Sequence, residues 1–200
     1  MKKAIRSLAI TTLGLTCMSA LAQNTTFSLL RSAGAEKAGA SCIPDARGRV
    51  TINSLGNVEV MHIEVSGLPP KTEFDAFVIQ LPNSPFGLSW YQGDLTTDTR
   101  GNGVADFVGR FSQETFIVAP GSGPAPVVHH QPIPDANTNP ATGPVHTFHV
   151  GLWFGSPQAA NEAGCGNGVT PFNGEHNAGL QALSTRNFGN TTGPLSRIHK

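Results

Sequence analysis

Short runs of alternating apolar and polar residues recur along the chain, and turn-forming residues separate them. Successive side chains of a β-strand point to opposite faces, so a period of two predicts strands rather than helices. Only one segment, 156–164, has helix signals, with Ser156 as N-cap, Pro157 in the first turn and Gly164 after the end. We expect strands at 48–54, 58–67, 74–81, on both sides of the loop in 91–111, and at 116–120, 146–154 and 179–185.

Two hairpins are expected among these strands. The first joins 48–54 to 58–67 through the turn Leu-Gly-Asn. Alternation slips within its second strand, where Val58 and Val60 differ in parity from the apolar residues that begin at Met61, and an inserted β-bulge accounts for such a slip. The second hairpin spans 91–111, because two β-rich runs flank an Asp/Asn/Gly loop that tolerates positive φ.

A Pro/Gly-rich segment without periodicity, 121–144, divides the expected strands. As a linker it would leave a C-terminal piece too small for its own core, so we interpret it as a long loop crossing one domain. The expected organisation is a signal peptide at 1–22, a lead segment at 23–46, a single domain at 47–188 and a tail at 189–200.

The first 22 residues combine a basic start, an apolar middle and an Ala-Leu-Ala end, which predicts a secretory signal cut between Ala22 and Gln23. The apolar run is too short for a stable transmembrane anchor. Lipoprotein processing at Cys17 is the alternative. We expect an extracytoplasmic protein, periplasmic or secreted.

After cleavage ten basic residues face thirteen acidic ones, a formal charge of about −3. Because no basic cluster exists to neutralise phosphates, we expect no nucleic-acid partner. The mature chain keeps two cysteines, Cys42 and Cys165, and an even pair in an oxidising compartment predicts a disulfide. Closing so long a loop stabilises a fold by roughly 4–5 kcal/mol.

The predicted fold is an all-β, immunoglobulin-like antiparallel β-sandwich of about seven to nine strands, with one short helix and the long Pro-rich loop. The stretches GLPPKTEFDAFV and TTDTRGNGVADF resemble hairpins of secreted bacterial immunoglobulin-like sandwich proteins. The resemblance covers residues 47–111. It implies a fold and an extracytoplasmic setting and carries no catalytic residues.

Histidines offer one candidate chemistry. In the strand HTFHVGLWF, His146 and His149 have opposite parity, so they cannot share a metal without a bulge. A zinc or copper site would need partners for His149, because neutral imidazoles are the nitrogen ligands that suit these metals. The other candidates are His129, His130 and His176, with His62 on an earlier strand.

Adjacent aromatic residues offer the other candidate. Trp90 and Tyr91 must point to opposite sides of a strand. The commoner arrangement buries Trp90 in the core with Tyr91 at its rim, whereas an exposed Trp90 would stack on a sugar ring or anchor a protein.

These observations favour a non-enzymatic binding or structural module, without cofactor, for a glycan, a protein or the cell envelope. The alternative is a zinc or copper protein, or a metal-dependent enzyme, built on the histidines. The sequence contains no motif of a nucleophilic, phosphate-binding or metalloprotease site.

Overall fold

A computed structural model describes residues 24–56, 58–87, 89–111, 147–171 and 177–198, and it confirms the all-β prediction. Eight antiparallel strands form one hydrogen-bonded ladder in the order β5-β4-β7-β10-β1-β2-β3-β6. The strands are β1 (Asn24–Arg31), β2 (Arg47–Ser54), β3 (Glu59–Ser66), β4 (Glu73–Ile79), β5 (Ser89–Thr96), β6 (Gly103–Gly109), β7 (His149–Phe154), β10 (Gln181–Ser184), and a separate pair, β8 (Thr170–Pro171) with β9 (Asn177–Ala178). The helices are α1 (Ala33–Ala38), α2 (Pro157–Glu162) and the 3-10 helix η1 (Pro194–Arg197).

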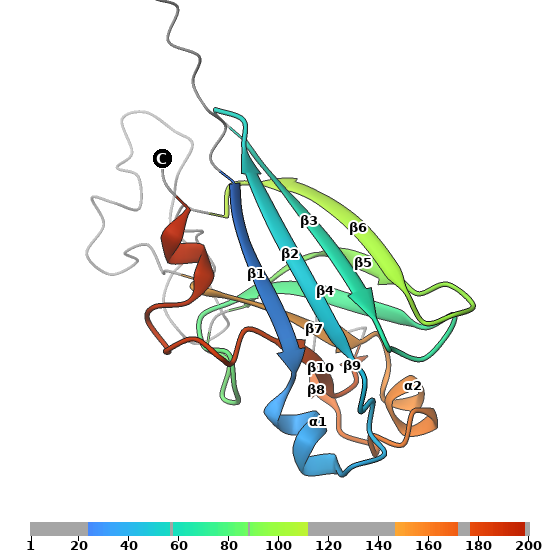
Figure 1. Cartoon of the computed structure of the whole chain (residues 1–200). Helices are drawn as coiled ribbons and strands as arrows, with labels where there is room; N and C mark the ends of the chain where they lie inside the picture. The colour runs from blue at the N-terminus through green and yellow to red at the C-terminus, as the bar shows by residue number, and fades with distance from the viewer. Residues whose placement is uncertain (1–23, 57, 88, 112–146, 172–176, 199–200) are drawn as a thin grey trace, which may run out of the picture.

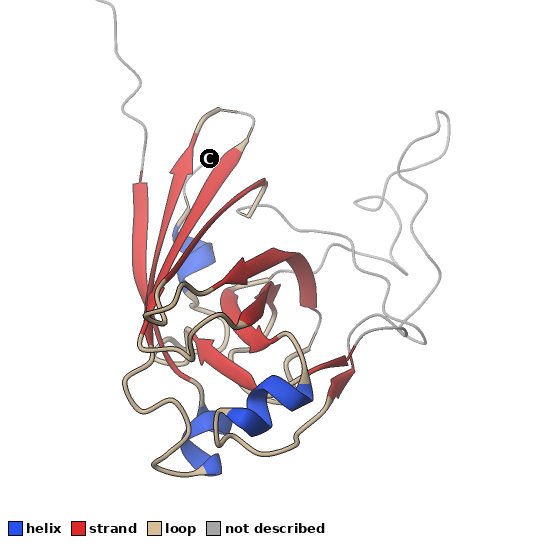
Figure 2. Ribbon diagram, turned by 90° about the vertical axis from the view of Figure 1, so that its right-hand side faces the viewer, coloured by secondary structure: helices blue, strands red, loops and turns tan. Residues whose placement is uncertain are grey.

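The ladder bends into two layers. Strands β1, β2, β3 and β6 form one layer, and β4, β5 and β7 lie across it in the other (Figures 1 and 2). Strand β10 joins the layers through two residue pairs with β1, Leu30 with Ser184 and Arg31 with Leu183. The main apolar core takes fully buried side chains from both layers, including Leu29, Val50, Ile63, Phe74 and Leu152.

The expected hairpin at 91–111 is wrong, because β5 pairs with β4 and β6 pairs with β3. The loop between them forms a tight turn at 98–102 and also hydrogen-bonds to the 67–72 turn. Thr97 exchanges bonds with the backbone of Thr72, and its hydroxyl donates to the Pro69 carbonyl at 2.6 Å. The Leu68 N–H donates to the Gly101 carbonyl. The two loops, 67–72 and 97–102, therefore lie side by side where the chain passes from one layer to the other.

The β-bulge expected in the second strand is also absent from the described residues. The β2–β3 hairpin itself is confirmed, with a continuous register from Ser54 opposite Glu59 to Arg47 opposite Ser66. In this register the side chain of Glu59 points inward and that of Val60 points outward. The pattern of apolar residues alone would not place a carboxylate at an inward position. The buried Glu59 carboxylate accepts the Phe111 N–H at 2.5 Å, which explains how the register tolerates it.

Two further predictions are confirmed, the start of helix α2 and the disulfide. Helix α2 begins after Ser156, whose hydroxyl accepts the Ala159 N–H at 3.2 Å. Cys42 and Cys165 form a disulfide that ties the segment after α1 to the segment after α2.

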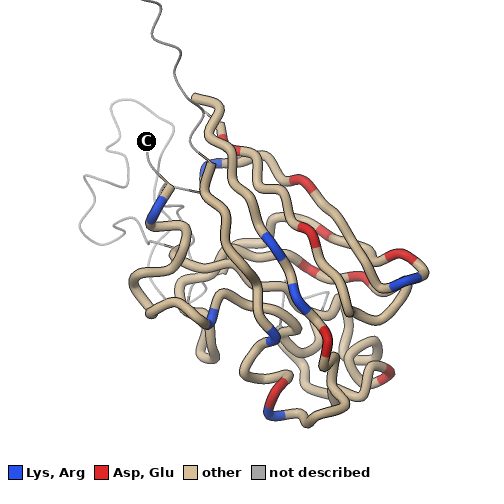
Figure 3. The backbone as a smooth tube through the Cα atoms, in the orientation of Figure 1, with Lys and Arg blue, Asp and Glu red and all other residues tan. Residues whose placement is uncertain are grey.

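Other parts of the chain differ from the sequence analysis or fall outside the description. The expected lead segment contains β1 and α1, and the expected tail contains η1. Residues 1–23 and 112–146, with Cys17, the Ala22–Gln23 cleavage site, the 116–120 strand and the 121–144 loop, lie outside the described residues. Within the described ranges no helix is long and apolar enough to cross a membrane. Basic and acidic residues are interspersed along the face shown in Figure 3.

Candidate aromatic binding site

The outer face of the β5-β4-β7-β10 layer carries a second apolar cluster, separate from the main core. Alternation along β4 sends Phe74, Ala76 and Val78 into the main core and leaves Phe77 and Ile79 on the other face. Strand β7 behaves in the same way, because Val150, Leu152 and Phe154 join the main core while Trp153 joins the outer cluster. This strand's alternation agrees with its prediction from sequence.

Aromatic rings meet edge to face in this outer cluster. The Trp153 ring centroid lies 5.1 Å from that of Phe77, at 71°, and 4.9 Å from that of Phe86, at 80°. The ring centroids of Phe77 and Tyr91 lie 5.6 Å apart. Such tilted contacts add to the stability that burial provides, so the rings form a fixed wall rather than a loose patch.

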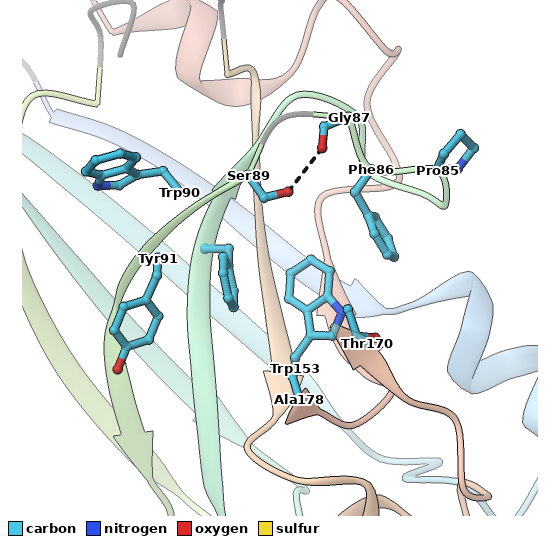
Figure 4. Close-up of a pocket in the computed structure, with 10 residues that line it drawn as sticks. Pro85, Phe86, Gly87, Ser89, Trp90, Tyr91, Trp153, Thr170 and Ala178 are labelled. Carbon is cyan, nitrogen blue, oxygen red and sulfur yellow. Dashed lines mark hydrogen bonds between the residues drawn. The ribbon is translucent and has the colours of Figure 1, made fainter. Parts of the chain in front are cut away.

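A pocket of about 790 Å³ opens beside this wall (Figure 4). The volume lies in the range of small-molecule sites. Aromatic side chains dominate its lining, and hydroxyl-bearing residues from β5 and β8 contribute the polar part. The described lining residues include Phe77, Phe86, Trp90, Tyr91 and Trp153, together with Ser89 and Thr170.

Trp90 and Tyr91 stand at the edge of the pocket on opposite sides of β5. Trp90 is 45% exposed, so the expectation that it fills the core is wrong, and its ring points away from Phe86 and Trp153 (Figure 4). Tyr91 is 38% exposed, and its hydroxyl donates to the Asp94 carboxylate at 2.5 Å. Burial, and then the hydrogen bond to Asp94 and its charge, raise the pKa of the Tyr91 hydroxyl well above its ordinary value.

Trp153 carries the least expected feature of the site. The side chain is only 2% exposed, and its indole N–H has no hydrogen-bond partner among the described residues. A buried donor left unpaired costs about 1–3 kcal/mol. Trp153 and Thr170 both line the pocket (Figure 4). Alternation along β7 puts Trp153 on the face opposite Val150 and Leu152, but nothing in the sequence indicates whether its nitrogen is paired.

Carboxylates lie next to the aromatic cluster on the same face. Asp75 stands opposite Asp94 on one side and opposite Trp153 on the other. Carboxylate oxygens of Glu73, Asp75 and Asp94 lie within 4.8 Å of one another. These oxygen ligands suit hard cations rather than zinc or copper. For the pocket, their main consequence is a local negative charge.

His149 is a buried residue whose two ring nitrogens are both hydrogen-bonded. A carbonyl only accepts, so Nε2 carries the proton and donates to the Asn190 carbonyl at 3.1 Å. Nδ1 then accepts from the Thr185 hydroxyl at 2.9 Å, and the same hydroxyl oxygen accepts the Val150 N–H at 3.2 Å. Burial lowers the pKa of His149, which favours this neutral form.

The structure brings no second described histidine to His149. His62 lies on β3 in the other layer, with Nδ1 at 2.6 Å from the Asp106 carboxylate. His129, His130, His146 and His176 lie outside the described residues, so a zinc or copper site using them stays a prediction. Any metal at His149 would have to displace one of its two hydrogen bonds.

The aromatic pocket is thus the described site that best fits a ligand. No protein-family model matches the chain, and no curated protein is significantly similar to it.

Proposed function

We propose that this protein is an extracytoplasmic, non-enzymatic binding module whose ligand enters the aromatic pocket on the outer face of β4, β5 and β7. The observation that carries the proposal is the pocket itself, about 790 Å³ in volume and lined by five aromatic residues, of which Trp90 and Tyr91 are exposed. Exposed aromatic surface beside a concave site is a common feature of binding sites.

The pocket stands on rigid supports. Phe77 and Trp153 project from strands that are paired on both sides, β4 and β7. Binding groups fixed by a sheet lose little conformational freedom when a ligand arrives, which favours affinity. The ligand classes that such a surface serves are a glycan, an apolar side chain of a partner protein, or a component of the cell envelope.

The polar groups of the lining support binding rather than catalysis. The Ser89 hydroxyl donates to the Gly87 carbonyl at 3.5 Å, and the Thr170 hydroxyl donates to the Gly179 carbonyl at 2.8 Å. Among the described residues, neither hydroxyl hydrogen-bonds to a general base of the kind that activates a nucleophile. The disulfide and the signal-like N-terminus support the extracytoplasmic setting.

Replacing Trp90 tests the proposal at low structural risk, because the side chain is largely exposed. Protein purified after export is titrated with envelope polysaccharides and with soluble oligosaccharides, and binding is followed by calorimetry. We expect Trp90→Ala to weaken binding at least about tenfold, since aromatic contacts dominate binding surfaces.

The matched control is Val108→Ala on β6, also largely exposed but outside the pocket. Its binding should equal that of the unmodified protein. Equal affinities for all three proteins, with binding present, would place the ligand elsewhere and overturn the proposal.

A further inference from the structure

The indole N–H of Trp153 has no partner among the described residues, and this indicates which chemical group a ligand of the pocket would supply. An indole nitrogen is a donor only, so the complementary group is an acceptor such as a hydroxyl or carbonyl oxygen. The nitrogen is covered in this structure, so an acceptor pairs with it only when the side chains that cover it move aside. Because no described residue pairs this donor, an acceptor on the ligand would add to affinity and would select oxygen-bearing ligands.

Charge around the pocket restricts the ligand further. The described lining contains no lysine or arginine, and the acidic group of Glu73, Asp75 and Asp94 lies on the same face. An anionic ligand would supply an acceptor but would be repelled by these carboxylates. A cationic ligand would be attracted to the carboxylates and the ring faces, but it would leave the Trp153 N–H unpaired.

A neutral sugar satisfies all of these conditions together. The C–H face of a sugar ring packs against aromatic side chains, its hydroxyl oxygens accept hydrogen bonds, and its hydroxyl hydrogens tolerate a nearby negative charge. Resting on the proposed function, we infer that the pocket binds a neutral saccharide whose hydroxyl oxygen accepts the Trp153 N–H while a sugar ring packs against the aromatic lining.

The indole N–H signals provide a direct measurement, because the chain has only two tryptophans. In the ¹⁵N-labelled full-length exported protein, Trp90→Phe assigns the two signals. The probes are the neutral cellotetraose, xylotetraose, mannotetraose and chitotetraose, the anionic tetragalacturonate, and the cationic tetramethylammonium. We expect a neutral probe to move the Trp153 N–H proton signal downfield, as gaining an acceptor does.

A pair of variants separates this hydrogen bond from general damage. Trp153→Phe keeps an aromatic ring without the donor and should weaken saccharide affinity about tenfold. Ser54→Ala is the matched control. The Ser54 hydroxyl is also buried and unpaired within the described chain, but it lies on β2 in the other layer and outside the pocket lining, so its loss should leave affinity unchanged. If Trp153→Phe does not fold, the shift of the Trp153 N–H signal in the unmodified protein still tests whether the hydrogen bond forms.

Three results would overturn the inference. A saccharide that shifts the signals of Trp90 and Tyr91 but leaves the Trp153 N–H unmoved would refute the hydrogen bond and leave the binding module intact. Preferred binding of tetragalacturonate or tetramethylammonium would refute the ligand class and again leave the module intact. If no probe perturbs the signals of the pocket, the inference that it binds a neutral saccharide is refuted. The proposed binding function is then tested separately, by comparing the binding of the unmodified protein and of Trp90→Ala to envelope material.

Discussion

The Nδ1 atom of His149 lies 2.9 Å from the hydroxyl oxygen of Thr185, which links the first residue of β7 to the residue after β10. The other ring nitrogen donates to the Asn190 carbonyl, so one imidazole fastens the C-terminal segment to the sheet. A protonated ring could not accept from Thr185, and it would place a charge in a fully buried position.

Acid should therefore destabilise the fold through His149. Its pKa is lowered in the folded protein, so below the unfolded value of about 6.5 the unfolded chain binds more protons. The free energy of unfolding should fall with pH from there down to the folded pKa, by up to about 1.4 kcal/mol per pH unit.

Urea unfolding of the native protein and of His149→Gln, from about pH 8 to about pH 5, measures this dependence. The variant should lack that part of the slope. Above about pH 7.5, where the ring is neutral in both states, the difference between the two proteins should be constant. Identical slopes below about pH 6.5 would contradict the prediction.

Gly101 should be intolerant of any side chain. Its φ is +76°, and a Cβ atom there would lie 2.0 Å from the Leu68 carbonyl oxygen in the neighbouring loop. Gly166 is the matched position, because its φ is +80° but nothing lies within 4 Å of its Cβ site.

We expect Gly166→Ala to cost about 1–2 kcal/mol of unfolding free energy from backbone strain alone. Gly101→Ala should cost a further 1–3 kcal/mol or so, because backbone atoms must also move. Chemical denaturation of both variants measures the difference, and equal losses would show that the two layer-crossing loops are not in contact as described.

Tyr91 should ionise only in strongly alkaline solution. It is the chain's single tyrosine, so the near-ultraviolet absorbance of tyrosinate reports it alone. Burial raises the pKa of the Tyr91 hydroxyl first, and Asp94 adds to the shift. In Asp94→Asn we expect the midpoint to fall partway toward the ordinary value of about 10.

The control for this titration is Asp106→Asn, which removes a carboxylate from β6 in the other layer. Its midpoint should match that of the unmodified protein. A Tyr91 midpoint near 10 in the native fold would show that the hydroxyl is neither buried nor bound to Asp94.

Local signals predicted the features that depend on neighbouring residues. The turn after Ser54, the cap at Ser156 and the parity of Trp153 in β7 follow from short stretches of sequence. Glu59 was missed because its inward position depends on the distant Phe111 N–H, which compensates the buried charge.

The pairing of β5 and β6 was missed for a related reason. The Asp98 carboxylate accepts the Arg100 and Asn102 N–H groups, as a tight turn requires, so the local chemistry is that of a hairpin. Contacts between Thr97 and Thr72 override it. The aromatic residues Trp90 and Tyr91 were predicted as a candidate site. The exposure of Trp90, and the lack of a described partner for the Trp153 nitrogen, depend on tertiary packing and were not.

Strand β1 pairs with β10, and the two are separated by almost the whole described chain. Strand β1 therefore cannot pair with β10 until almost the whole described chain is available for folding. Such high contact order slows folding and exposes unpaired edges meanwhile. The native topology consequently forms late in folding. A chain shortened before Ser184 would lose the β1–β10 pairing that joins the two layers.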